Sequence, residues 1–224
     1  MTVIVASHQP NFIPNMGYFY KMECATLFTI SDNCTFSRSE YINYNYVSMN
    51  GKRMKLTVPV SSHSKPINET ELADWDKNKK KIWNTLQTCY GKYEYFKLYK
   101  DDLRQIIKGD YKYISELNLS LIKFIRSKFK IDTPIIKESD FFSKKKSPIE
   151  EIKDICYLTQ AEYYLSGNGA KKYMAEDDIK PYKLIWSNYL PCEEEYSALH
   201  YLFVYGPNAM KKYEKEREAL LHGI

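Results

Sequence analysis

The spacing of hydrophobic positions changes at a pair of prolines near the start of the chain. Residues 2–7 are mostly apolar and β-branched, and this pattern predicts a buried strand. Pro10 and Pro14 follow and prevent either a strand or a helix from continuing. From Asn15 onward apolar residues recur every three or four positions, which predicts a helix, and residues 27–30 predict a second strand. A strand, a rigid loop, a helix and a further strand make the first unit of a parallel sheet covered by helices.

The rest of the chain carries patterns of the same kinds. Asn50-Gly51, between the strand-like segments 46–49 and 55–60, predicts a tight antiparallel hairpin. Ser147, with a proline next to it and glutamates in the following turn, is typical of a helix start. The remaining expected elements are helices over residues 78–90, 99–108, 111–129, 147–160 and 197–205, a helix from about residue 170, and short strands over residues 134–136, 163–166 and 184–186. We therefore expect an α/β fold with a mixed, mainly parallel sheet covered by helices, and a helical layer in the middle of the chain.

The length and composition fit one ordinary globular domain. With 224 residues, of which 44% are hydrophobic and 27% charged, the chain has enough apolar side chains for a substantial core. We expect a single α/β domain over residues 1–224, with a small helical subregion over about residues 75–130. The longest apolar runs are far shorter than the roughly 20 residues of a membrane span, and the first residues do not resemble a signal peptide. These features predict a soluble, cytoplasmic protein.

The cysteines, the histidines and the charge argue against several kinds of site. The 5 cysteines and 4 histidines lack the spacing of a disulfide framework or a zinc site, so we expect no metal. The net charge of +5 is a weak signal for nucleic acid, because lysine, asparagine and tyrosine are abundant together along the chain. The lysine runs Lys79–Lys81 and Lys144–Lys146 are therefore interpreted as solvated surface, and no nucleic-acid partner is expected.

His8 is the best single candidate for chemistry. It follows the first predicted strand at the point where the chain leaves the sheet, and ligands of parallel sheets bind beyond the carboxyl ends of the strands. A neutral imidazole is able to act as a general base or a nucleophile near pH 7. The amide of Gln9 is able to orient a substrate or to donate to a developing oxyanion. The alternative is structural: the His8 ring bonds a backbone carbonyl and closes the loop.

Other polar groups follow later predicted strands. Ser166-Gly167-Asn168-Gly169 resembles a strand-to-helix turn that binds an anion, since glycines expose backbone N–H groups and a following helix adds its positive end. The motif is neither a Walker loop nor a dinucleotide fingerprint, and a plain structural turn explains it equally well. Asp32, Arg38 and Asn43 follow the second strand and suit a polar ligand. A surface ion pair is the alternative for any one of them.

The order of these motifs resembles the WbqC-like protein family. His8-Gln9-Pro10-Asn11-Phe12-Ile13-Pro14, continuing through Gly17-Tyr18-Phe19 to Lys21, is similar to the opening signature of that family. Further similar positions follow in the same order over nearly the whole chain, at Asp32, Phe36, Arg38, Tyr41, Asn43, Asn45, Leu56–Val60, Trp75, Tyr90, Tyr164–Gly167, Gly169, Tyr173 and Ser197–Gly206. The first block is specific, and the later ones are individually loose.

The resemblance implies a bacterial protein linked to O-antigen, capsule and related glycans. It implies a transferase that moves an acyl or aminoacyl group from a carrier-protein thioester to a nucleotide-linked amino sugar. His8 and Gln9 would serve catalysis, and the expected substrate-binding residues are Asn11, Lys21, Asp32, Arg38, Asn43, Ser166, Gly167, Asn168 and Gly169. No tightly bound cofactor is implied beyond a phosphopantetheine-linked acyl donor, and the lysine runs would face an acidic carrier protein or a nucleotide diphosphate.

Three positions depart from the family pattern and keep alternatives open. Thr26 and His200 stand where the family has aspartates, and Tyr44 stands where it has an arginine. These changes are compatible with a changed substrate, or with a non-catalytic assembly or regulatory subunit of a glycan pathway. A further alternative is a nucleotidyltransferase, because a strand followed by a histidine loop and a helix is similar to enzymes that bind triphosphates. Tyr18 stands where the second motif histidine of those enzymes is expected.

Overall fold

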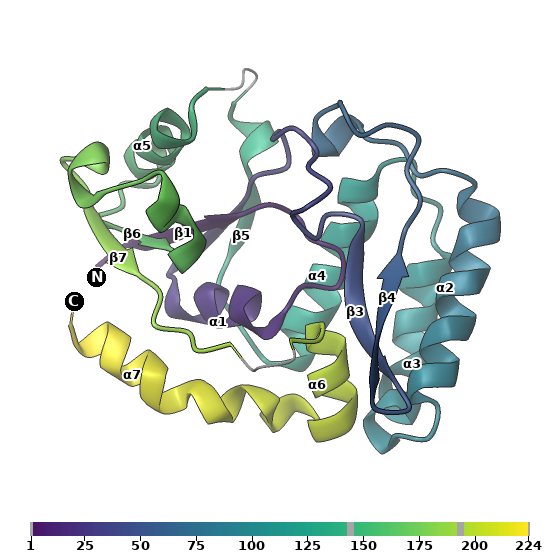
Figure 1. The fold of residues 1–224 in the computed structure, drawn as a ribbon. Helices are drawn as coiled ribbons and strands as arrows, with labels where there is room; N and C mark the ends of the chain where they lie inside the picture. Colours follow the sequence, from purple (N-terminus) through teal and green to yellow (C-terminus); the bar gives the residue numbers. More distant parts are fainter. Residues whose placement is uncertain (1, 143–145, 192–194, 224) are drawn as a thin grey trace.

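A parallel sheet of five strands lies at the centre of the computed structural model, which describes residues 2–142, 146–191 and 195–223 (Figure 1). The strands are β1 (Ile4–His8), β2 (Leu27–Ile30), β5 (Ile135–Lys137), β6 (Tyr163–Ser166) and β7 (Lys183–Trp186). They lie in the order β5-β2-β1-β6-β7, and every pair is parallel. The central, buried strand predicted near the start of the chain is therefore confirmed as β1.

The predicted hairpin forms a small sheet of its own. β3 (Tyr44–Met49) and β4 (Lys52–Thr57) pair antiparallel, and Asn50 and Gly51 join them with φ angles of 51° and 78°. Both angles are positive, which the asparagine-glycine pair accommodates at low cost. The predicted α/β fold with a mainly parallel sheet is confirmed, and the antiparallel pair forms a sheet separate from the five parallel strands rather than a mixed part of it.

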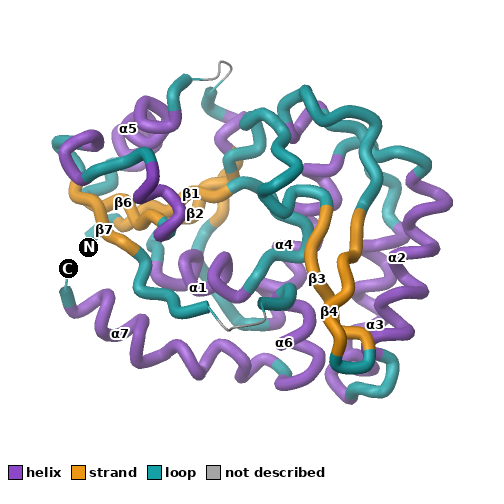
Figure 2. Tube along the Cα trace, in the orientation of Figure 1, coloured by secondary structure: helices purple, strands orange, loops and turns teal. Residues whose placement is uncertain are grey.

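Helices cover both faces of the central sheet. Their bounds are α1 (Met16–Cys24), α2 (Trp75–Tyr90), α3 (Glu94–Lys108), α4 (Ile114–Lys128), α5 (Pro148–Thr159), α6 (Ala198–Tyr205) and α7 (Glu214–His222) (Figure 2). Ala6 packs with buried residues of α1, whereas its neighbour Val5 packs with Ile152, Ile155 and Cys156 of α5. Since successive strand residues point to opposite faces, α1 and α5 lie on opposite sides of β1.

The helical layer predicted in the middle of the chain is present as α2, α3 and α4. Its core is continuous with that of the sheet, because buried residues of all three helices belong to the same cluster as Ala6. Trp83 and Phe96 stack with their ring centroids 6.0 Å apart, and Phe96 meets Phe203 of α6 at 5.1 Å. Ser147 caps α5 by accepting a hydrogen bond from the backbone of Glu150, as its sequence predicted.

The C-terminal helix α7 runs beside α1 along one side of the molecule (Figure 1). No hydrophobic periodicity predicts it, because no side chain is buried along Glu214–His222, all of which the structure describes. The half-buried Leu220 packs against the core, and polar contacts complete the attachment. Arg217 pairs with Glu23 of α1 at 2.5 Å, and the amide nitrogen of Asn188 donates to the Glu216 carbonyl oxygen at 2.7 Å.

The lysine runs were expected to be solvated surface. Lys79 pairs with the exposed carboxylates of Asp76 and Asp110 at 2.6 and 3.1 Å. Lys146 pairs with Asp154 at 2.5 Å, and residues 144 and 145 lie outside the described residues.

Along the described parts of the chain, none of the helices combines the length and the apolarity that crossing a membrane requires.

Candidate functional site at the carboxyl edge of the sheet

The loop after β1 is held from the inside of the protein. The amide nitrogen of Asn118, on α4, donates to the Pro10 carbonyl oxygen at 2.7 Å. The amide nitrogen of Asn45, on β3, donates to the Ile13 carbonyl oxygen at 2.9 Å. Such partners are what buried backbone groups require. They fix the path of the loop and therefore the end of β1.

His8 occupies the last position of β1. Its Nδ1 lies 3.1 Å from the carbonyl oxygen of Gln9. A carbonyl oxygen only accepts, so Nδ1 carries the proton and the neutral ring keeps a lone pair on Nε2. The ring packs against Tyr18, with the ring centroids 4.7 Å apart. The hydrogen bond from the ring to a backbone carbonyl, which a purely structural role of His8 predicts, is thus present. The same hydrogen bond sets the tautomer that a general base needs.

Two neighbouring basic groups have strongly lowered pKa values. Burial, and then the ammonium group of Lys21, lower the pKa of His8 to about 3, so this imidazole is neutral at pH 7. Burial lowers the pKa of Lys21 to about 7, against the opposing effect of Glu138. Lys21 Nζ donates to the Ser7 carbonyl oxygen at 2.7 Å from a side chain that is buried in α1. Groups whose pKa values are perturbed by burial and by a neighbouring charge are typical of functional sites.

Glu138 follows β5 directly and connects three strands. Its Oε1 accepts hydrogen bonds from the hydroxyl groups of Ser7, Thr29 and Ser31 at 2.5, 2.7 and 2.7 Å. The side chain is only 2% exposed. Sequence reasoning missed this residue, because it lies in a polar segment after a strand of three residues. The available signal was the one that pointed to His8 and Asp32, namely a polar residue at the carboxyl end of a predicted parallel strand.

A polar pocket opens beside this cluster. The backbone nitrogen and the hydroxyl group of Ser139 donate to the carboxylate of Asp32 at 3.0 and 2.7 Å. A cavity of about 280 Å³ lies next to them, and its lining residues are Ile30, Asp32, Asn68, Tyr113, Ser115, Glu116, Leu119, Lys137 and Ser139. Ile30 pairs with His8 across the sheet. The pocket therefore lies about one strand away from the imidazole.

The segment 166–169 leaves the same edge of the sheet. Leu165 of β6 pairs with Ala6 of β1, so the two strands end side by side. A short 3-10 helix (Asn168–Lys172) follows in place of the α-helix expected from about residue 170. The polar pocket beside Asp32 is lined neither by His8 nor by residues 166–169. Contact of both groups with one ligand stays a prediction.

The glycines of this segment leave space open. Neither Gly167 nor Gly169 has a positive φ, and a Cβ built at either position meets no atom within 4 Å. The backbone conformation therefore does not require glycine. The Asn168 amide nitrogen donates to the Ser187 carbonyl oxygen at 3.0 Å, which links the ends of β6 and β7.

The other expected substrate-binding residues have different surroundings. Asn11 is 8% exposed, and its Oδ1 has no hydrogen-bond partner in the described part of the chain. The amide nitrogen of Asn43 donates to the Val58 carbonyl oxygen at 2.9 Å, inside the fold. Arg38 is exposed, with Nη2 3.2 Å from Nδ1 of His63. The sheet edge thus brings His8, Lys21 and Asp32 together, whereas Asn43 supports the fold.

The departures from the family pattern lie on other elements. Thr26 binds the opposite end of β1, where its Oγ1 accepts from the Ile4 nitrogen at 2.9 Å and donates to the Ile4 carbonyl oxygen at 3.0 Å. Tyr44 lies on the hairpin under the ammonium group of Lys55. His200 lies on α6 and packs against the Tyr196 ring at 4.5 Å. The three changes therefore leave the cluster around His8 as it is.

Within the described residues, no group of three or more histidine, cysteine or acidic side chains is placed to hold a metal ion.

These features define an α/β protein with a polar site at the carboxyl edge of a parallel sheet. Residues 9–208 match the WbqC-like protein family, and the chain therefore belongs to it. The resemblance predicted from the motifs is confirmed. The chain is also similar to a Mycobacterium tuberculosis (strain ATCC 25618 / H37Rv) protein named "Uncharacterized protein Rv1507c", with 27% identity over 227 residues that cover 92% of this chain and 95% of the relative.

Proposed function

We propose that this protein is a transferase of bacterial surface-glycan biosynthesis. It moves an acyl or aminoacyl group from a carrier-protein thioester to the amino group of a nucleotide-linked amino sugar. The pathway is the one implied by the resemblance described in the sequence analysis, and the chemistry rests on one observation. His8 ends the central strand as a neutral imidazole whose Nδ1–H is engaged by a carbonyl, which leaves the Nε2 lone pair for a substrate proton.

The reaction needs an attacking amine, an oxyanion donor and a proton acceptor. The amine nitrogen attacks the carbonyl carbon of the thioester, and the carbonyl oxygen takes up negative charge. The C–S bond then breaks, so the products are an amide and a thiol that carries the proton lost by the amine. In this proposal Nε2 of His8 accepts that proton and returns it to the sulfur, and the side-chain amide of Gln9 donates to the oxyanion.

After burial, Lys21 is the second cause of the low pKa of His8, and it therefore modulates how readily His8 accepts the proton. A charged ammonium group near the ring opposes formation of the imidazolium, and it contributes to the low pKa of His8. Because the pKa of Lys21 is about 7, this group loses its charge just above neutral pH. The repulsion then disappears, and the imidazole becomes a better base. Lys21 is therefore a positioning residue that acts through His8.

The test uses mass spectrometry after incubation of the protein with nucleotide-linked amino sugars and an acyl-loaded carrier protein. The expected product is a sugar heavier by one acyl group. The variant His8→Ala should fold normally and lose activity by roughly a hundredfold or more. His222→Ala, an exposed position at the end of α7, is the matched control and should keep full activity.

Two results would count against the proposal. A folded His8→Ala protein with unchanged activity would remove His8 from the mechanism. A protein that binds another protein of the pathway, and acylates no sugar, would be the non-catalytic subunit of the alternative interpretation.

A further inference from the structure

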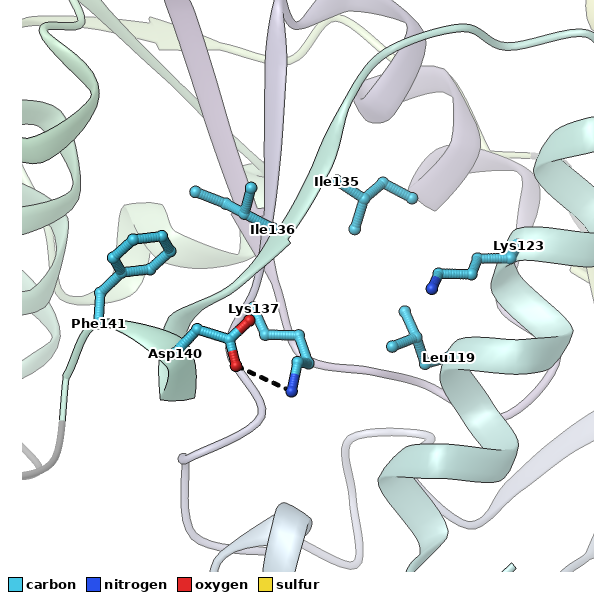
Figure 3. A pocket seen from close by; sticks show the side chains of 7 residues that line it. All are labelled: Leu119, Lys123, Ile135, Ile136, Lys137, Asp140 and Phe141. Atoms are coloured by element: carbon cyan, nitrogen blue, oxygen red, sulfur yellow. Dashed lines mark ion pairs between the residues drawn. The ribbon is translucent and has the colours of Figure 1, made fainter.

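A second pocket lies along the outer edge of the sheet. It has a volume of about 230 Å³, and it is lined by Leu119, Lys123, Ile135, Ile136, Lys137, Asp140 and Phe141 (Figure 3). β5 is the edge strand in the strand order. Ile135 and Ile136 point to opposite sides of this strand in Figure 3, as successive strand residues do. A pocket that touches both of them therefore follows the strand edge itself.

The edge of β5 offers backbone groups for pairing. The Phe28 nitrogen donates to the Pro134 carbonyl oxygen at 2.9 Å, and Phe28 is in register with Ile135. In a parallel pair alternate residues direct their backbone groups toward the neighbouring strand. Ile136 therefore faces β2, and the N–H and C=O of Ile135 face the open side. A ligand that contains amide groups is able to extend the sheet here.

The side chains around this edge define the rest of the ligand. Leu119, Ile135 and Phe141 present apolar surface. Lys137 is paired with Asp140 at 2.9 Å, whereas Lys123 is exposed and has no ion pair within the described residues. The groove thus suits an extended molecule with apolar segments, amide groups and an anionic end beside Lys123.

The groove adjoins the polar pocket near His8. Leu119 and Lys137 line both cavities, and the inner cavity reaches Asp32 and Ser139. β5 is separated from β1 by β2 alone. With strands about 4.8 Å apart, His8 is on the order of 10 Å from the edge strand. An elongated ligand that enters beside Lys123 therefore has its inner end directed toward the imidazole.

We propose that this groove binds the 4′-phosphopantetheine arm of an acyl carrier protein. The phosphate lies beside Lys123, the amide groups follow Ile135, and the thioester reaches the inner pocket. A phosphate held at an exposed lysine stays at the surface, where a protein attached to it has room. This inference rests on the proposed acyl transfer and adds the place where the donor binds.

The experiment measures binding by calorimetry, with 4′-phosphopantetheine and with pantetheine, which lacks the phosphate. Lys123→Glu should weaken binding of 4′-phosphopantetheine about tenfold and leave binding of pantetheine unchanged, because only the phosphate meets the lysine. Leu119→Trp should abolish binding of both compounds by filling the groove. Lys81→Glu, on an exposed position of α2, is the charge-matched control and should change neither affinity.

A second readout separates the groove from the reaction. With the acyl-loaded carrier protein as donor, Lys123→Glu should raise the KM for the carrier and leave kcat unchanged. The groove assignment is wrong if the unmodified protein does not bind 4′-phosphopantetheine, or if Leu119→Trp, shown to be folded by circular dichroism, binds it equally well. If the variants behave as expected and no sugar is acylated, the groove stands and the proposed function is wrong.

Discussion

The ammonium group of Lys21 is a residue-scale feature with a measurable effect on stability. Burial lowers its pKa from 10.5 to about 7 in the folded protein. Between these two pH values the unfolded chain binds a proton that the folded protein has released, so the free energy of unfolding rises with pH. Below pH 7 both states are charged, and the folded state carries the full cost of a buried ammonium group.

The variant Lys21→Met should therefore be more stable than the unmodified protein at pH 6. The expected difference is on the order of a few kcal/mol, since each pKa unit corresponds to about 1.4 kcal/mol. It should shrink as the pH rises from 7 toward 10.5. Urea unfolding at a series of pH values measures this difference, with Lys81→Met as the exposed control. A difference that does not depend on pH would mean that Lys21 is not a buried titrating group.

At the same scale, the sequence located His8 but not its surroundings. An apolar run followed by Pro10 and Pro14 was sufficient to place His8 at the end of a buried strand. The contact with Gln9 is local, and it was anticipated as a backbone hydrogen bond. Glu138 reaches the site only because β5 pairs with β2. Such a pairing over a long sequence distance has no local signal.

Among the secondary-structure elements, β1, β2 and β5 are joined by the carboxylate of Glu138. Glu138→Ala would leave the buried hydroxyl group of Thr29 without its acceptor, and would leave the hydroxyl groups of Ser7 and Ser31, 2.6 Å apart, with only each other. Unpaired buried hydroxyl groups are costly, so we expect a loss of about 2–4 kcal/mol in the free energy of unfolding. Urea denaturation measures it.

Glu138→Gln is the matched control for this change. All three hydrogen bonds end on Oε1, so an amide that places its oxygen there keeps them. Its destabilisation should be less than half that of Glu138→Ala. Equal losses in the two variants would show that the charge of Glu138, and not its acceptor oxygen, stabilises the sheet edge.

The elements themselves were largely predictable where local chemistry decides them. Asn50-Gly51 determined the hairpin, and the Ser147 cap determined the start of α5. The separation of that hairpin from the parallel sheet was not predictable, because it depends on which strands meet after folding. Likewise α7, which buries no side chain fully and is held by Leu220 and by polar contacts such as Arg217 with Glu23, gave no hydrophobic pattern to detect.

In the molecule as a whole, the strand order divides the carboxyl edge into two halves. Strands β2 and β5 lie on one side of β1, and strands β6 and β7 lie on the other side. The loops after β1 and β6 therefore diverge at the point where ligands bind in open α/β sheets. The groove beside β5 opens on one half, and the segment 166–169 leaves the sheet on the other. We expect the acyl donor on the first half and the nucleotide-linked sugar on the second, with His8 between them.

Substitutions at Gly169 test this division of the sheet edge. A Cβ at this position meets no atom within 4 Å, and the φ angle is not strained, so Gly169→Ala and Gly169→Leu should keep the stability of the protein. If the sugar nucleotide approaches the backbone there, a longer side chain excludes it. The KM for the sugar should then rise slightly for Gly169→Ala and at least about tenfold for Gly169→Leu, while the KM for the carrier protein stays the same. Lys123→Glu should give the reverse pattern. A Gly169→Leu protein that keeps the normal KM for the sugar would show that the segment 166–169 is a structural turn, and that His8 and this segment do not share a ligand.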